Sequence, residues 1–497
     1  MNSSWVFSEL VDGFVAQGNP ASTAVTGLCF DSRKAQPGEV FFALPGSSNA
    51  TLDGHQFVSA AYDAGIRAFV TLEMPPGLED KPDAVVVTVP DVRVALALAA
   101  ATWHGHPARE LKTVAITGTK GKTTISFMLK SIFEAAGKRV GIIGSNGIFY
   151  GDTWLKLLNT TPEPVVLHQQ LAAMVAAGVE YLFMETTSQG YMMHRTDGIE
   201  FELGLYTNIS PDHISATEHR DFDDYFFWKQ HIFTQVKEAF VNRDAECYER
   251  IVAGVSVPLH TFGTGADCEY RAEDIKTTLD GRRMGVEFEC VTSAGSYPVR
   301  LGIPGSFNAG NGLAAAGVAH FFGIESRFVQ EGLREFSVKG RMEYLDTPSD
   351  YTVLIDFAHN LISIESMMAT AREYRPNRIL SVFGLEGDRA HIRRFDCGRV
   401  LGRDADYVIL SDASPRRDDP EQILADIATG IEEGGGTGKY EIIRDRHVSI
   451  PKILDMAEPG DLVLLVGKGD VPYEEVMGEK IPFDEREVVA EYFADKR

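Results

Sequence analysis

The stretch LKTVAITGTKGKTT, residues 111–124, decides the fold that the sequence predicts. Its first part, LKTVAITG, is a continuous apolar run, typical of a strand buried on both faces of a parallel sheet. A Gly-rich turn follows it, and a helical pattern then runs from Thr123 to Ala136. A strand, a Gly-rich turn and a helix in this order favour a phosphate-binding loop, because backbone N–H groups and the helix N-terminus attract phosphate oxygens.

The loop itself carries the residue types that a nucleoside triphosphate requires. Lys122 is placed to reach the β- and γ-phosphates, and the Thr123 hydroxyl is placed to bind Mg²⁺. Ile116 stands where the usual GxxxxGK[ST] pattern has its first glycine, so the match is incomplete. We expect these residues to contact the nucleotide: Gly118, Thr119, Lys120, Gly121, Lys122, Thr123 and Thr124.

Outward from this loop, the chain alternates strands and helices. The runs YLFME (181–185) and LGLYTNI (203–209) each end in polar residues, which indicates a doubly wound parallel sheet. Short alternating strands over residues 268–302 predict a β excursion. We expect an α/β protein of three domains: a small N-terminal α/β domain (1–105), a central ATPase-type parallel sheet (106–337) and a Rossmann-like C-terminal domain (338–497).

Length and composition agree with this division. At roughly 150 residues per domain, 497 residues predict three domains. The net charge of −24 argues against a broad nucleic-acid surface, which needs a basic face. The five cysteines are scattered and form no CxxC pair, so we expect neither a disulfide framework nor a structural zinc site. With no signal-peptide pattern and no apolar run of ~18 residues, the sequence favours a cytoplasmic enzyme.

Several polar residues at strand ends are candidates for chemistry. Glu185 ends a buried strand, where it suits either Mg²⁺ or a helix cap. Taken alone, His213 indicates an ordinary satisfied polar residue, and Lys229, in DDYFFWKQHIF, indicates a lysine whose stem packs on aromatic rings. Four further strands end in polar groups, which together indicate a site: Asp356 with His359, Asp388 with Arg389, Ser414 with Arg416, and Lys468.

Taken together, the ordered motifs resemble the Mur ligases, the ATP-dependent amino-acid ligases of peptidoglycan precursor synthesis. Within them the chain resembles the MurE type, the UDP-N-acetylmuramoyl-tripeptide synthetases. The resemblance covers nearly the whole chain and rests on many motifs in family order: DSRKAQPGEVFFALPG, DGHQFVSAAYDAGIRAFV, GTKGKTT, TTPEP, METTSQGYMMHR, YTNISPDHI, YFFWKQHIF, GSFNAGN, GRMEYL, IDFAHN and GKGD.

The resemblance implies a reaction and its partners. The N-terminal domain would bind the uridine nucleotide, the central domain ATP, and the C-terminal domain the amino acid together with part of the ATP. ATP would phosphorylate a carboxylate of UDP-MurNAc-L-Ala-D-Glu, and the amine of a free amino acid would attack the acyl phosphate. We also expect a monomer, with no membrane insertion and no nucleic-acid partner.

The resemblance also implies residue roles. Lys122, Lys229, His213 and Glu185 would be catalytic, and Thr123, Glu185, His213 and Lys229 as a CO₂-derived carbamate would bind Mg²⁺, which reverses the local interpretation of Lys229. Further ATP contacts would be Asn308, Arg341 and Asp356. The UDP-substrate residues would be Ser32, His55, Asn159, Thr160, Thr161, Thr187, Ser188 and Arg195. The amino-acid pocket would hold Arg389, Ser414, Arg416, Gly467 and Asp470.

The amino-acid pocket departs from the family pattern. Diaminopimelate-adding members carry Asp-Asn-Pro-Arg where this chain has Ala413-Ser414-Pro415-Arg416, and Gly-Lys-Gly-His-Glu where it ends in Asp470 and Val471. Gln189 replaces the histidine that is usual at this position, and this replacement is similar to lysine-adding members. The pocket motif of the lysine-adding members is nevertheless absent too. L-lysine, L-ornithine and meso-diaminopimelate all stay open, with a weak preference away from diaminopimelate.

Two other functions stay open at this point. One is another amide ligase of the same superfamily, with a different acceptor or of the folylpolyglutamate type. The DSR and DGH motifs of the N-terminal domain speak against the folylpolyglutamate type. The other is a non-catalytic nucleotide-binding protein, which has no need of a second α/β unit bearing ATP contacts.

Overall fold

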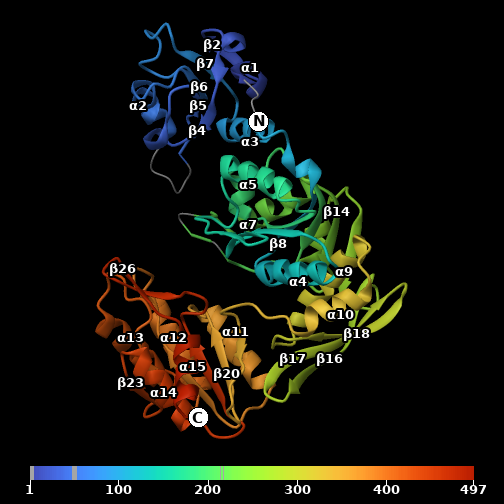
Figure 1. Cartoon of the computed structure of the whole chain (residues 1–497), viewed down its shortest axis with the longest axis vertical. Helices are drawn as coiled ribbons and strands as arrows, with labels where there is room; N and C mark the ends of the chain where they lie inside the picture. Colours follow the sequence, from blue (N-terminus) through green and yellow to red (C-terminus); the bar gives the residue numbers. More distant parts are fainter. Residues whose placement is uncertain (1–4, 47–52, 213, 216–217, 497) are drawn as a thin grey trace. The chain divides into compact units, whose positions relative to one another are not determined.

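The computed structural model describes residues 5–46, 53–212, 214–215 and 218–496 (Figure 1). The predicted site residue His213 lies outside these ranges. The chain divides into two compact units, Met1–Arg271 with Leu313–Phe328, and Ala272–Gly312 with Val329–Arg497.

A five-stranded sheet forms the core of the N-terminal domain. Its order is β2-β7-β6-β5-β4, with β4 to β7 parallel and β2 antiparallel at one edge. The strands of this sheet are β2 (Phe14–Gln17), β4 (Gly27–Cys29), β5 (Glu39–Phe42), β6 (Ala68–Thr71) and β7 (Val85–Thr88), and β1 (Trp5–Val6) pairs with β3 (Ala24–Val25) in a separate two-stranded sheet. The helices are α1 (Phe7–Leu10), α2 (Val58–Asp63) and α3 (Val92–Trp103).

An eleven-stranded sheet runs through the central part of the chain, in the order β11-β10-β9-β12-β8-β13-β14-β15-β16-β17-β18. Strands β9, β12, β8, β13, β14 and β15 are parallel, as predicted. Antiparallel strands extend the sheet at both edges. The predicted β excursion is confirmed as β16 to β18, whereas the hairpin of β10 and β11 was not foreseen.

The bounds of these elements follow the sequence pattern closely. The strands are β8 (Lys112–Thr117), β9 (Val140–Gly144), β10 (Gly147–Tyr150), β11 (Thr153–Leu155), β12 (Tyr181–Glu185), β13 (Phe201–Tyr206), β14 (Val236–Asn242), β15 (Leu259–Gly263), β16 (Tyr270–Asp280), β17 (Arg283–Thr292) and β18 (Gly295–Leu301). The helices are α4 (Lys122–Ala135), α5 (Pro164–Ala176), α6 (Ser188–Met192), α7 (Phe222–Gln230), α8 (Tyr248–Val252), α9 (Asn308–Phe321) and α10 (Ser326–Arg334).

The C-terminal domain is a doubly wound six-stranded sheet, in the order β19-β20-β24-β21-β22-β23. Its strands are β19 (Glu343–Leu345), β20 (Thr352–Asp356), β21 (Ile379–Phe383), β22 (Tyr407–Leu410), β23 (Tyr440–Ile442) and β24 (Leu462–Val466), and a separate hairpin holds β25 (Tyr473–Val476) and β26 (Glu479–Pro482). The helices are α11 (Leu361–Glu373), α12 (Ile392–Asp404), α13 (Pro420–Glu433), α14 (Arg446–Met456) and α15 (Glu485–Asp495).

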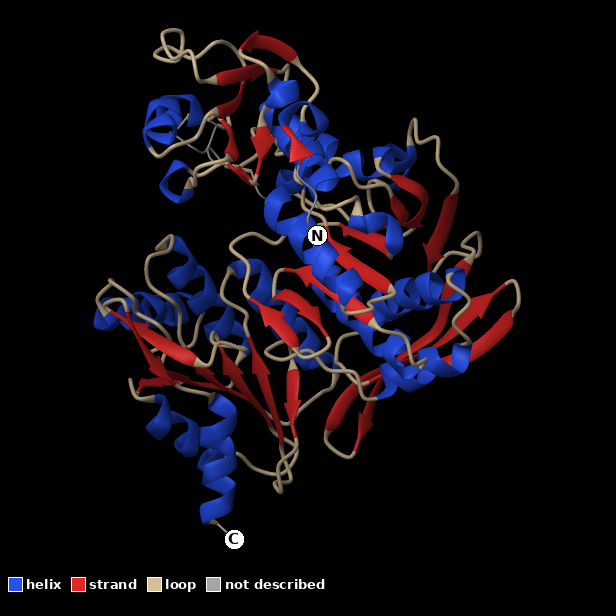
Figure 2. Ribbon diagram, turned by 45° about the horizontal axis from the view of Figure 1, so that its top comes forward, coloured by secondary structure: helices blue, strands red, loops and turns tan. Residues whose placement is uncertain are grey.

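Successive strand residues of this sheet face opposite cores. Leu354 and Leu464 pack with α11, α12 and α13, whereas Val353 and Leu465 pack with α14 and α15 on the other face. Figure 2 shows helices on both sides of the sheet. Each fully buried Leu or Ile of these cores contributes about 1.5–3 kcal/mol. The predicted fold class, three α/β domains with parallel sheets, is therefore confirmed, and the exact boundaries stay a prediction.

The described helices include none that is both long and apolar enough to cross a membrane.

One buried histidine makes the stability of the first unit sensitive to acid. His168 of α5 is fully buried near His104 and His106, and neither of its ring nitrogens has a hydrogen-bond partner among the described residues. Burial, reinforced by the two neighbouring histidines, lowers the pKa of His168 to about 3. The unfolded chain therefore binds a proton at this residue below about pH 6.5, while the folded chain does not until about pH 3.

Replacing His168 with Leu should reduce this acid sensitivity. In the native protein, stability falls as pH drops from about 6.5 towards 3, and this residue contributes a loss on the order of several kcal/mol. His168→Leu should leave stability at pH 7 equal or higher, because two unpaired polar atoms disappear. Urea unfolding at pH 7 and pH 5 measures both effects, and an unchanged pH dependence in the variant would contradict the assignment.

Candidate functional site

The predicted phosphate-binding loop packs tightly against the neighbouring strand end, where β13 stops. Gly118 has φ +144°, and a side chain there would collide with Thr207 Oγ1, so only glycine fits. The Thr207 hydroxyl donates to the Lys120 carbonyl over 2.8 Å, and Asn208 Oδ1 accepts from the Lys120 N–H over 2.9 Å. These bonds fix the turn between β8 and α4. Lys120 was predicted from the sequence, whereas Thr207 and Asn208 were not.

Two buried lysines converge on the carbonyl oxygen of Gly118. Lys122 Nζ donates to it over 2.8 Å, and Lys229 Nζ donates to it over 2.9 Å. Burial lowers the pKa of Lys122, an effect that Glu185 and Asp212 oppose. Burial, followed by the positive charge of Lys122, lowers the pKa of Lys229 well below its usual value. Lys229 is thus no snorkelling surface lysine, since it is only 2% exposed.

Glu185 lies at the end of β12 with its carboxylate held by three donors. Thr123 Oγ1 donates to Oε1 over 2.8 Å, and Ser145 donates to the same carboxylate from its N–H over 3.1 Å and its hydroxyl over 3.2 Å. The side chain is buried. The structure therefore brings together Glu185 and Thr123, two of the predicted Mg²⁺ residues, and adds Ser145. The sequence signal for Ser145 was GSNG (144–147) at the end of another strand of the sheet.

The predicted muramoyl-dipeptide residues gather beside Glu185. Thr161 is buried, and its hydroxyl accepts from the Thr187 N–H over 3.1 Å. Thr160 lies 3.1 Å from Ser145 Oγ, measured between the hydroxyl oxygens. Arg195 donates to Glu163 Oε1 over 2.8 Å and to the Thr161 carbonyl over 3.3 Å. Asn159, by contrast, is exposed.

The predicted uridine residues lie at the carboxyl ends of the N-terminal strands. Ser32 follows β4 in a short 3₁₀ turn, and His55 follows β5. His55 Nε2 accepts from the Leu72 N–H over 3.2 Å, so its Nδ1–H donates to Asp53 over 2.7 Å. Both residues therefore occupy the edge where open α/β sheets bind ligands.

Three predicted ATP contacts belong to the second unit. Asn308 begins α9, and its amide donates to the Pro304 carbonyl over 2.7 Å. Asp356 ends β20 and accepts from the Met342 and Ala358 N–H groups, both over 2.7 Å. Burial raises the pKa of Asp356, while the nearby Arg341 guanidinium opposes this shift.

The predicted amino-acid pocket is more acidic than the sequence suggested. Arg416 donates to Glu386 Oε2 over 2.9 Å and lies 3.7 Å from Glu475 Oε2, measured from its Nε. Ser414 Oγ accepts from the Glu475 N–H over 3.1 Å. Arg389 pairs with the same Glu386 over 3.8 Å. Glu386 and Glu475 were both missed, because a Glu in a turn or hairpin carries no distinctive pattern.

The remaining pocket residues take their positions from glycine geometry. Gly467 has φ +103°, and a side chain there would collide with the Gly384 carbonyl. Asp470 is exposed, and its N–H passes close to Gly340.

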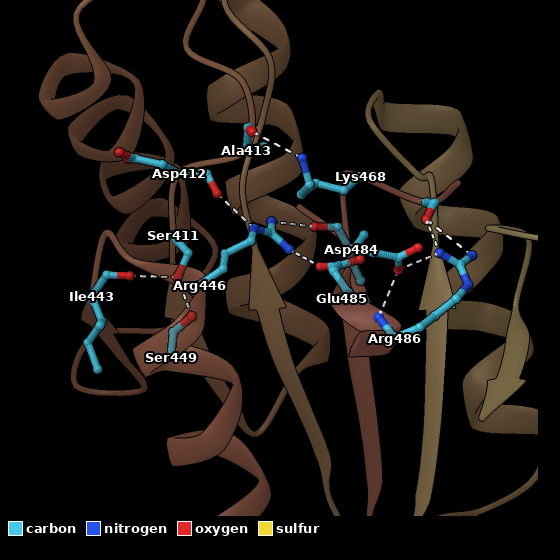
Figure 3. Close-up of polar contacts among 12 residues, drawn as sticks. Ser411, Asp412, Ala413, Ile443, Arg446, Ser449, Lys468, Asp484, Glu485 and Arg486 are labelled. Atoms are coloured by element: carbon cyan, nitrogen blue, oxygen red, sulfur yellow. Dashed lines mark hydrogen bonds and ion pairs between the residues drawn. The ribbon is translucent and has the colours of Figure 1, made fainter. Parts of the chain in front are cut away.

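A buried charge network anchors this pocket (Figure 3). Arg446 and Glu485 form an ion pair with almost no exposure, and Arg446 also donates to the Asp412 carbonyl over 2.7 Å. Lys468 donates to the carbonyls of Tyr473 over 2.8 Å and Ala413 over 3.3 Å. Burial lowers the pKa of Lys468 to about 8. Lys468 thus ties the loop before Ser414 to the β25–β26 hairpin.

Within the described part of the chain, no cluster of three or more His, Cys, Asp or Glu side chains is arranged as a metal site. Mg²⁺ does not require one, because it binds through one or two carboxylates together with substrate phosphates and water. The Glu185 carboxylate and the Thr123 hydroxyl fit such a site, and they lie at the phosphate loop.

Two domain families match parts of this chain. Residues 116–319 match the Mur ligase middle domain, and residues 340–469 match the Mur ligase glutamate ligase domain. A relative from Caldanaerobacter subterraneus subsp. tengcongensis, named UDP-N-acetylmuramoyl-L-alanyl-D-glutamate–2,6-diaminopimelate ligase, is 35% identical over 96% of each chain.

Two solved structures also align with this chain. A structure with that same enzyme name aligns with a TM-score of 0.74 at 25% identity and covers 99% of each chain. A folylpolyglutamate synthase from Mycobacterium tuberculosis aligns with a TM-score of 0.59 at 19% identity, covering 76% of this chain and 92% of its own, which shows a shared fold. Given the full-length match at 35% identity and the two matching domains, the chain belongs to the Mur ligase family.

Proposed function

We propose that this Mur ligase is a cytoplasmic, ATP-dependent enzyme that joins a free diamino acid to UDP-MurNAc-L-Ala-D-Glu, the third-residue step of peptidoglycan precursor synthesis. The observation that carries this proposal is the convergence of Lys122 and Lys229 on the Gly118 carbonyl beside the Glu185–Thr123 pair. Relatives with the matching enzyme name span nearly the whole chain. The division into domains of 1–105, 106–337 and 338–497 for nucleotide substrate, ATP and amino acid is part of the proposal.

The chain's own residues supply the positive charge that phosphoryl transfer needs. The loop N–H groups and Lys122 would hold the β- and γ-phosphates, and stabilising charge on the transferred group is the dominant contribution in such reactions. Mg²⁺ held by Glu185 and Thr123 would neutralise further phosphate charge. Asn308, Arg341 and Asp356 of the second unit are proposed as further ATP contacts.

The predicted muramoyl-dipeptide residues would position the substrate carboxylate that ATP phosphorylates. Thr160, Thr161, Ser188 and Arg195 would hold the dipeptide, with the guanidinium of Arg195 suited to its carboxylates. A carboxylate oxygen attacks the γ-phosphorus, the bond to the bridging oxygen breaks, and ADP leaves. The amine of the amino acid then attacks the acyl carbon, and phosphate departs as the amide forms.

Lys229 would act as a carbamate. Its burial and the charge of Lys122 both favour the neutral amine, and the neutral amine is the form that attacks CO₂. Forming the N–C bond and releasing one proton converts the lysine into an anionic group resembling a carboxylate. Such a group suits a second Mg²⁺, as a hard oxygen ligand.

Lys229→Ala should reduce ligase activity by about 100-fold or more, the scale on which removal of one transition-state contact acts. A short carboxylate such as propionate should restore part of the activity, because it can occupy the space of the carbamate. The measurement is phosphate release with and without propionate. Full activity in the variant would contradict the role.

Lys237→Ala provides the matched control for this variant. Lys237 lies on β14, is half exposed and pairs only loosely with Glu202 over 3.7 Å. We expect normal activity and no response to propionate in this control.

The charges around Arg416 support a diamino acid as the second substrate. The Arg416 guanidinium suits the α-carboxylate, and the Glu386 and Glu475 carboxylates suit ammonium groups. The names of the relatives favour diaminopimelate, against the weak preference drawn from Asp470 and Val471. We therefore rank meso-diaminopimelate first, ahead of L-lysine and L-ornithine.

Phosphate release with UDP-MurNAc-L-Ala-D-Glu and each amino acid in turn tests the proposal. One amino acid should give turnover well above the others, with meso-diaminopimelate expected. Turnover with L-lysine alone would overturn the ranking but keep the reaction. No turnover with any of the three, at folded protein and saturating ATP, would favour another acceptor, such as a folate.

Arg416→Lys should raise the KM for the amino acid by about tenfold or more, because Lys cannot form the two-pronged bond to a carboxylate. The KM for ATP should change little. Initial rates over a range of amino-acid concentrations measure this split, and equal changes in both constants would argue for a general loss of structure instead.

A further inference from the structure

A chain of three polar side chains, of which His219 and Ser188 are buried and Asp224 is partly exposed, lies beside the predicted muramoyl-dipeptide residues. His219 has no exposed surface, and its Nε2 lies 2.8 Å from Ser188 Oγ. Its Nδ1 lies 3.0 Å from Asp224 Oδ2. The Tyr225 ring packs against the imidazole, with the two ring centroids 5.3 Å apart. Asp224, His219 and Ser188 thus form a relay from the start of α7 to the start of α6.

The donor and the acceptor of each hydrogen bond in this relay follow from which atoms carry protons. An ionised carboxylate accepts hydrogen bonds and donates none, so Asp224 requires the proton of His219 on Nδ1. A neutral imidazole protonated on Nδ1 has a lone pair on Nε2. When the His219 ring is neutral, the Ser188 hydroxyl therefore donates its single proton to Nε2. Its oxygen keeps lone pairs for a further partner but has no proton to offer.

We infer that Asp224 and His219 are positioning residues that turn Ser188 into an obligate hydrogen-bond acceptor for a peptide N–H of the bound muramoyl-dipeptide. This inference rests on the proposed function, which places Ser188 at that substrate. An acceptor at this point excludes a substrate carboxylate, since carboxylates need donors.

The neighbouring residues support an acceptor role for Ser188 and a donor role for Arg195. Ser188 is the first residue of α6 and is buried, which makes an unpaired lone pair costly and a substrate N–H favourable. Thr187 beside it is occupied as the N-cap, accepting from the Gly190 N–H over 2.9 Å. Arg195, held by Glu163, supplies the donors that the substrate carboxylates need.

The tautomer of His219 can be read directly by ¹⁵N NMR of histidine-labelled protein, in the absence of substrate. The His219 signals are those missing from His219→Gln, in a spectrum that otherwise keeps the remaining histidines. We expect the Nδ1–H tautomer in the native protein and a shift to the Nε2–H tautomer in Asp224→Asn, whose amide can donate to Nδ1. An Nε2–H tautomer in the native protein, or no change in Asp224→Asn, would overturn the relay.

Asp223→Asn is the matched control. Asp223 precedes Asp224 in the first turn of α7, and its exposed carboxylate pairs with Arg250 over 2.7 Å. The control makes the same change of charge at the same helix end, so it should keep the native tautomer. It should also bind UDP-MurNAc-L-Ala-D-Glu normally, whereas Asp224→Asn should bind it about tenfold more weakly. Equal affinities in both variants would count against the inference.

A substrate analogue tests which group Ser188 accepts from. Replacing each amide N–H of the lactyl-L-Ala-D-Glu segment by an ester oxygen gives two depsipeptide ligands. One of them should bind the native protein about tenfold or more weakly than the amide and show no further loss with Ser188→Ala. Equal losses in both proteins, for both esters, would overturn the assigned contact.

These experiments separate failure of the inference from failure of the proposed function. If the native protein binds the nucleotide dipeptide but Ser188→Ala shows no coupling to either ester, only the inference is wrong. If the native protein neither binds nor turns over the nucleotide dipeptide, the proposed function and the assigned contact both fail. The NMR experiment reads the relay in either case.

Discussion

The close approach of Gly118 to Thr207 is the constraint on which the central domain depends. No side chain fits between them, so β8 and β13 meet at a fixed distance just where both strands end. The Gly118 carbonyl then lies where two lysines from distant parts of the chain reach it. The conformation of the predicted phosphate loop is therefore determined mainly by backbone packing, and less by its charged side chains.

Positive charge on both lysines at one buried carbonyl would be repulsive, and nearby carboxylates reduce this repulsion. Asp212 opposes the lowering of the pKa at both lysines, and Glu185 does so at Lys122. Since burial disfavours the charged forms, the resting site is poised to accept negative charge. The triphosphate of the proposed nucleotide substrate would supply such charge.

Much of this architecture was predictable from the residues, because buried strands and Gly-rich turns have strong local patterns. The loop at 118–124, Glu185 and the strand ends of the C-terminal sheet were all located in this way. The partners Ser145, Thr207, Glu386 and His219 were not, since each is a common polar residue whose role depends on a neighbour far away in sequence. For Lys229, the local aromatic pattern favoured a lysine packed at the surface, whereas the structure shows that it is buried at the loop.

The backbone conformation of Arg416 limits how the amino-acid specificity of a Mur ligase can be changed. Arg416 has φ +53°, its N–H donates to the Glu475 carbonyl over 2.9 Å, and its carbonyl accepts from the Met477 N–H over 2.7 Å. The conformation of this loop is thus imposed by a hairpin about sixty residues further along the chain. Grafting a four-residue pocket motif from another ligase would leave that template unchanged. To transfer amino-acid specificity from another ligase, the Arg416 loop and the β25–β26 hairpin would have to be exchanged together.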